Sequence, residues 1–119
     1  MAGSRLKIEQ VGDVAVVRFG DCRTLDESSS HAVGQELNDL VDKEGHRKVL
    51  LDMSEVAFLT STALGKLVIL HKKLRVSGGL LKICSLQGPI ESIFQITHLN
   101  HLFDIYPDEA AALLAFAKR

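Results

Sequence analysis

The sequence predicts a single α/β domain with a mixed, mostly parallel β-sheet and helices packed against it. Short apolar runs alternate with segments of helical periodicity, the first two runs form a hairpin pattern, and 119 residues suffice for one core. Strands that alternate with helices require parallel, right-handed crossovers. The expected order is therefore β-β-α-β-α-β-α-β-α over residues 1–119, with residues 1–4 disordered.

Apolar runs mark the expected strands, and capping or breaking residues mark the helix ends. The expected strands are residues 6–10, 14–19, 49–51, 80–84 and 102–106, with a tight turn at Gly12-Asp13. The expected helices begin at Asp26 or within residues 28–30, after residues 60–62, at Gly88-Pro89 and at Pro107. The last helix is expected to bury Ala110, Leu113, Leu114 and Ala117, with Phe116 beside them.

The composition argues against several classes of function. Because 14 basic residues face 15 acidic ones, no strong field attracts nucleic acid or an anionic membrane. No apolar run approaches the roughly 20 residues of a membrane span, and residues 1–5 do not form a signal peptide. Cys22 and Cys84 fit neither a metal pair nor a disulfide framework. We expect a cytoplasmic domain with reduced cysteines and no cofactor.

Motifs of catalysis and nucleotide binding are missing from the sequence. The loop of residues 20–23 carries neither a GxGxxG nor a P-loop pattern, and no GxSxG elbow is present. Sequence spacing assigns no histidine to Ser61 as a base, and His71 is expected to be a hydrogen-bonded core residue. His98 and His101 would share a metal only on a helix, which the adjoining residues disfavour. We therefore expect no metal site and no enzyme activity.

Three consecutive hydroxyl residues, Thr60-Ser61-Thr62, stand between a buried strand at 49–51 and a helix. That helix is indicated by Leu64, Leu67 and Val68 at helical spacing. In open α/β sheets this edge is where binding sites are commonly built. A helix start also favours an anionic group. We expect one of the three hydroxyls to be the N-cap, a role that needs only one.

Residues 49–54, 58–59 and 61–65 together resemble STAS domains of the bacterial anti-sigma factor antagonist type. The resemblance extends over nearly the whole chain, and residues 79–84 resemble the fourth strand of that family. Members commonly carry Asp-Leu-Ser and then, several residues later, Asp-Ser-Ser/Thr-Gly-Leu-Gly. The resemblance therefore implies the STAS fold for this chain.

In that family, the serine after the second Asp is the phosphoacceptor, and it maps onto Ser61. Two positions depart from the pattern, since Thr60 replaces the acid and Ala63 replaces the first glycine. If the acid helps a kinase to orient the serine, its loss affects phosphorylation. Thr60 and Thr62 are the alternative phosphoacceptors.

The resemblance implies a transcription regulator that acts by binding a protein. Its unmodified form would bind an anti-sigma factor that is a serine-protein kinase of the ATPase fold, and phosphorylation of Ser61 would disable it. A phosphatase would be a further partner. The expected partner-binding residues are Asp21, Thr24, Leu25, Asp26, Glu27, Phe58, Leu59, Thr60, Ser61, Thr62, Ala63 and Gly65.

Two other functions remain open at this point. Because Thr60 replaces the acid, the chain is alternatively a STAS adaptor without phosphorylation, in a signalling or lipid-transport complex. The third hypothesis is a small α/β enzyme or nucleotide-binding protein, which the missing motifs disfavour.

Overall fold

The computed structural model describes residues 6–20, 24–25 and 27–118, of which 27–30 and 118 are described by their backbone alone. Predictions for residues 1–4 and for Asp21 and Asp26 lie outside this range. The strands are β1 (Lys7–Val11), β2 (Val14–Arg18), β3 (Thr24–Leu25), β4 (Lys48–Asp52), β5 (Phe58–Leu59), β6 (Leu80–Cys84) and β7 (Asp104–Tyr106). The helices are α1 (Glu27–Asp42), α2 (Ser61–Val76), α3 (Gly88–Ile96), the 3₁₀ turn η1 (Leu99–His101) and α4 (Glu109–Lys118).

A five-stranded sheet with the order β1-β2-β4-β6-β7 forms the centre of the fold. β1 is antiparallel to β2, and every other pairing in this sheet is parallel. The hairpin turn has φ of 61° at Gly12, which an L side chain rarely adopts. The predicted mixed, mostly parallel α/β fold is confirmed. Because β2, β4, β6 and β7 are parallel, their carboxyl ends lie along one edge, here called the carboxyl edge.

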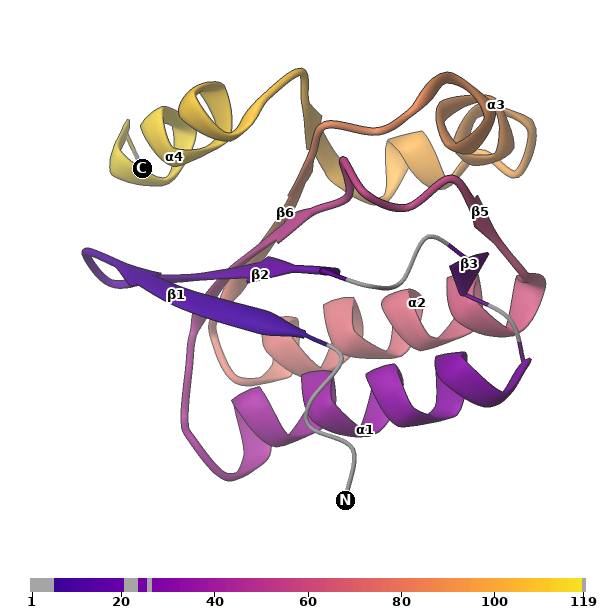
Figure 1. The fold of residues 1–119 in the computed structure, drawn as a ribbon. Helices are drawn as coiled ribbons and strands as arrows, with labels where there is room; N and C mark the ends of the chain where they lie inside the picture. The colour runs from indigo at the N-terminus through magenta and orange to yellow at the C-terminus, as the bar shows by residue number, and fades with distance from the viewer. Residues whose placement is uncertain (1–5, 21–23, 26, 119) are drawn as a thin grey trace.

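The helices form two layers around this sheet (Figure 1). α1 and α2 lie side by side on one face, and α4 lies on the opposite face. The larger core lies beneath the first pair and includes Leu37 of α1, Leu67 of α2 and Phe94 of α3. The smaller core joins Leu50 of β4 to Phe116 of α4. β4 is therefore covered on both faces, as its continuous apolar run indicates.

The predicted buried face of α4 is wrong for three of its four residues. Among the described side chains of this helix, Ala112 and Phe116 are buried and Leu113 is half-buried against the smaller core, whereas Ala110, Leu114 and Ala117 are exposed. Nearly every position of α4 is apolar, so several stripes at helical spacing fit its sequence equally well. The sheet selects the stripe that inserts the large Phe116 ring.

Two further differences concern short elements. β3 and β5 pair in parallel as a separate two-stranded sheet that the sequence does not predict. The last strand was expected from residue 102 but begins at Asp104, because η1 precedes it. Within the described residues, no helix is long and apolar enough to cross a membrane.

Candidate functional site

β3 is held against the segment that leads into α2 by its pairing with β5. Thr24 pairs with Phe58 and Leu25 with Leu59, and the Thr60 N–H donates to the Leu25 carbonyl at 3.1 Å. Leu25 and Leu59 are buried, so they anchor this pair in the core. Thr24 and Phe58 are exposed beside the helix start.

Thr60 is the N-cap of α2, so the prediction that one of the three hydroxyls caps the helix is confirmed. Its backbone is extended, and its side-chain oxygen accepts a hydrogen bond from the Ala63 N–H at 3.3 Å. Its carbonyl accepts the first helical bond, from Leu64. A helix needs one such cap, which leaves the next hydroxyl free of this role.

Ser61 is the first helical residue of α2, and it is exposed. Within the described part of the chain, its hydroxyl makes no hydrogen bond to another side chain or carbonyl. The first turn of α2 contains no acidic residue, so the partial positive charge of the helix start is not offset there. The geometry therefore presents a hydroxyl to solvent at a position that tolerates an anion.

The structure brings together most of the predicted partner-binding residues. Four of these residues are exposed, and we call them the Ser61 surface: Thr24, Phe58, Ser61 and Gly65. Leu25, Leu59 and Ala63 are buried beneath it and support it, while Thr60 and Thr62 are half-buried. Of the predicted acidic loop, Asp21 and Asp26 lie outside the described residues. Glu27 is described only by its backbone, at the start of α1.

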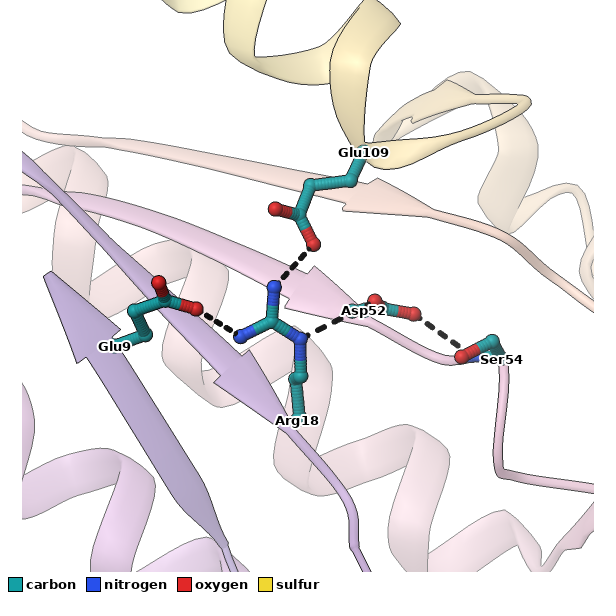
Figure 2. A network of polar contacts seen from close by, with 5 residues as sticks. All are labelled: Glu9, Arg18, Asp52, Ser54 and Glu109. Atoms are coloured by element: carbon teal, nitrogen blue, oxygen red, sulfur yellow. Dashed lines mark hydrogen bonds and ion pairs between the residues drawn. The ribbon is translucent and has the colours of Figure 1, made fainter. Parts of the chain in front are cut away.

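A second polar group occupies the same edge, around Arg18 at the end of β2 (Figure 2). The Arg18 guanidinium donates from Nη1 to Glu9 and from Nη2 to Glu109, both at 2.6 Å. Its Nε lies 3.8 Å from Asp52 Oδ2, and Asp52 Oδ1 accepts from the Ser54 N–H at 3.0 Å. The hydrogen bond to Glu9, and then that to Glu109, raise the pKa of Arg18. We call these five residues the Arg18 network.

Sequence reasoning missed the Arg18 network. Its residues come from β1, β2, the end of β4, the loop after β4 and the first turn of α4. The local signals are the charges at the ends of β2 and β4, an acid in the middle of β1 and the acid at the start of the last helix. None of these indicates which charges meet, since Arg18 and Glu109 are separated by 91 residues.

The loop from β4 to β5 is held by the last residue of β6 and by the segment that follows it. The Met53 N–H donates to the Cys84 carbonyl at 3.0 Å, and Gln87 Nε2 donates to the Ser54 carbonyl at 2.7 Å. Cys84 itself is a free, buried thiol. Burial raises its pKa to about 11, so the thiol stays protonated at neutral pH. This loop leads directly to Phe58 and the Ser61 surface.

The histidines form no metal site within the described residues, where no cluster of three or more His, Cys, Asp and Glu could hold an ion. The rings of His98 and His101 stack at 6.0 Å across η1. His71 is buried as predicted, edge-on to Phe103 with ring centroids 5.4 Å apart. The expected hydrogen bond is wrong, because neither ring nitrogen has a partner among the described residues. Burial, and then the Arg75 cation, lower the pKa of His71, while Asp104 opposes them.

Comparison with known proteins assigns the class. The family model of the STAS domain matches residues 5–112, so the chain belongs to the STAS domain family. The anti-sigma F factor antagonist of Paenibacillus polymyxa is 22% identical over 109 residues, which cover 92% of each chain.

Solved structures agree with this fold. An anti-sigma-factor antagonist (STAS) domain protein from Planctomyces limnophilus superposes with a TM-score of 0.86 at 24% identity, over 94% of this chain and 97% of that one. The Bacillus cell fate determinant SpoIIAA, in its phosphorylated form, superposes with a TM-score of 0.70 at 16% identity, over 92% and 98% of the two chains. At such identities the structures establish a shared fold.

Proposed function

We propose that this chain is an anti-sigma factor antagonist whose Ser61 surface binds a kinase-type anti-sigma factor in the cytoplasm. Phosphorylation of Ser61 disables the complex, and a phosphatase restores it. The observation that carries the proposal is the exposure of Ser61 as the first residue of α2 while Thr60 provides the cap.

The physical effect of phosphorylation follows from this position. A phosphoryl group adds about −1.5 to −2 charges near neutral pH. The helix start favours that charge by roughly 0.3–1 kcal/mol when exposed, so the free domain stays folded. A partner packed against Phe58 must instead desolvate or repel the group. Each ~1.4 kcal/mol of that penalty weakens binding tenfold.

The relatives support this proposal through their descriptions. The Paenibacillus polymyxa relative is an anti-sigma F factor antagonist, and SpoIIAA has been solved in a phosphorylated form. A phosphorylation switch needs an accessible acceptor hydroxyl and a local structure that tolerates the added negative charge. Ser61 is exposed, and its position at the start of α2 favours an anion.

Incubation with an ATPase-fold serine kinase and Mg-ATP, followed by peptide mass spectrometry, tests the proposal. We expect phosphate on the peptide that contains Ser61, and at least a 100-fold loss of affinity for the kinase by calorimetry. Ser61→Ala should bind as the unmodified chain does and accept no phosphate. Ser54→Ala, an exposed serine on the same edge, should accept phosphate normally. Absence of both modification and binding would refute the proposal.

A second candidate function is a STAS adaptor that is never phosphorylated. Thr60 favours it, because a capping threonine stands where the family pattern has an acid. In that case Ser61→Ala and Ser61→Asp would bind the partner equally well. The same calorimetric series therefore separates the two functions.

A further inference from the structure

The exposed side of α2 continues from Ser61 to the other end of the helix. Ser61, Gly65, Ile69, Lys72 and Val76 follow one another at spacings of four, four, three and four residues, and all are exposed. Residues three and four apart share one side of a helix. These five residues, which we call the α2 stripe, span about 22 Å at 1.5 Å per residue.

Two large apolar side chains project from the C-terminal half of the α2 stripe. Ile69 is 49% exposed and Val76 is 90% exposed. They are seven residues apart, about two helical turns. They line an open groove of about 490 Å³ with Asp42, Lys72, Lys73 and Ser77.

The charges beside this groove are mainly positive. Lys73 is neutralised by Asp42 of α1, with its Nζ 3.0 Å from Oδ2. Lys72, which lines the groove, and Arg75, which lies three residues further along α2 and outside the groove lining, are exposed and form no ion pair with any described residue. The partial negative charge at the C-terminus of a helix stabilises nearby cations, and this accounts for the positive charge of Lys72 and Arg75. It does not account for the two exposed apolar residues on either side of these cations, Ile69 before them and Val76 after them, which cost solubility without stabilising the core.

We propose that the α2 stripe binds an acidic amphipathic helix of the same partner that contacts Ser61. Two apolar side chains of that helix, about two turns apart, contact Ile69 and Val76. Its carboxylates pair with Lys72 and Arg75. The inference rests on the proposed function and adds the chemistry of the partner. Because Ser61 is the first residue of the stripe, a single partner can contact Ser61 and the groove at Ile69 and Val76 together.

Binding of the kinase to three variants on α2 and to two control variants tests this inference by calorimetry at low and high salt. Lys72→Glu and Arg75→Glu should each weaken binding about tenfold at low salt and less at high salt, because salt screens exposed charges. Val76→Ser should weaken it severalfold at both salt concentrations. Lys43→Glu, at the exposed residue directly after α1, is the charge control, and Leu114→Ser, exposed on α4, is the apolar control; both should bind normally.

The outcomes separate this inference from the proposed function. Normal binding by Lys72→Glu, Arg75→Glu and Val76→Ser, together with a loss for Ser61→Asp, overturns the inference and leaves the function intact. No binding by the unmodified chain overturns both. Sedimentation that shows self-association abolished by Val76→Ser would assign the stripe to a second copy instead. Binding to phosphatidylserine vesicles that Lys72→Glu abolishes would assign it to a membrane.

Discussion

The two parts of the carboxyl edge are built in opposite ways. In the Arg18 network, charged side chains contact one another and join β1, β2, β4 and α4. Around Ser61, the chain is held in place by the backbone pairing of β3 with β5 and by the single N-cap Thr60. The first arrangement uses its polar groups internally, whereas the second leaves a hydroxyl exposed.

The comparison indicates how the carboxyl edge of the sheet can serve both stability and recognition. Where side chains satisfy one another, as Arg18 and Glu109 do, little remains for a partner. Where buried leucines and backbone bonds hold the chain, as at Leu25 and Leu59, the exposed side chains are available for binding. Three of the four predictions below test this contrast and the fourth concerns a residue outside it; they run from the largest expected effect to the smallest.

Removing the buried anchor of β3 should have the largest effect. Leu25 is 1% exposed, so Leu25→Ala should lower the free energy of unfolding by about 2–5 kcal/mol through lost burial and a cavity. Phe58→Ala, in the paired strand but 53% exposed, should change it by less than about 1 kcal/mol. Urea denaturation measures both. Equal losses would mean that the exposed strand partner also carries stability.

Breaking the Arg18 network should come next. Arg18→Met keeps the aliphatic stem but leaves Glu9, Asp52 and Glu109 without their cation, so we expect a loss of about 1–3 kcal/mol. The matched control is Lys48→Met, which breaks the exposed Lys48–Asp13 pair at 2.7 Å and should cost about 1 kcal/mol or less. Kinase binding by Arg18→Met should stay normal under native conditions. A loss of binding would place this network in the recognition surface.

Substituting Thr60 and Ser61 one at a time should distinguish the hydroxyl that caps α2 from the hydroxyl that is exposed to solvent. Thr60→Ala removes the acceptor for the Ala63 N–H and should cost about 1 kcal/mol in thermal or urea unfolding. Ser61→Ala should alter stability by less than about 0.5 kcal/mol, because this hydroxyl is exposed and does not cap. The reverse order would show that Ser61, and not Thr60, satisfies the helix start.

Acid should weaken the domain slightly through His71, which lies on α2 away from both parts of the edge. The pKa of His71 is lowered in the folded chain, mainly by burial, so the unfolded chain binds a proton first as pH falls below about 6.5. Stability is therefore full above that pH and declines below it, by at most about 0.7 kcal/mol between pH 7 and pH 6.

Urea unfolding across this pH range checks the His71 prediction. His71→Leu should remove this part of the pH dependence, because the buried group no longer titrates. His31→Leu, exposed on α1, is the control and should retain it. An unchanged slope in His71→Leu would mean that other groups cause the acid sensitivity.

The predictions from sequence worked best where a pattern is local and long. The strand expected at 80–84 and the helix expected after residues 60–62 are marked by apolar patterns over several residues, and both are present. β3 and β5 are two residues each, too short for any period to show. The stripe chosen for α4 was wrong because its sequence is apolar on all sides, and only the large ring of Phe116 distinguishes the buried one.

The sequence by itself determined the α/β order, the position of the hydroxyl residues between a buried strand and a helix, and the resemblance that points to Ser61. Each of these depends on residues close together in the chain. Only the tertiary structure decided that Thr60 caps α2, that Leu25 pairs with Leu59, and that Arg18 meets Glu109. The last two contacts join segments far apart in sequence, and their energy exists only after the sheet has brought them together. For that reason, local chemistry marks the site, but the fold determines which of its groups remain exposed for a partner.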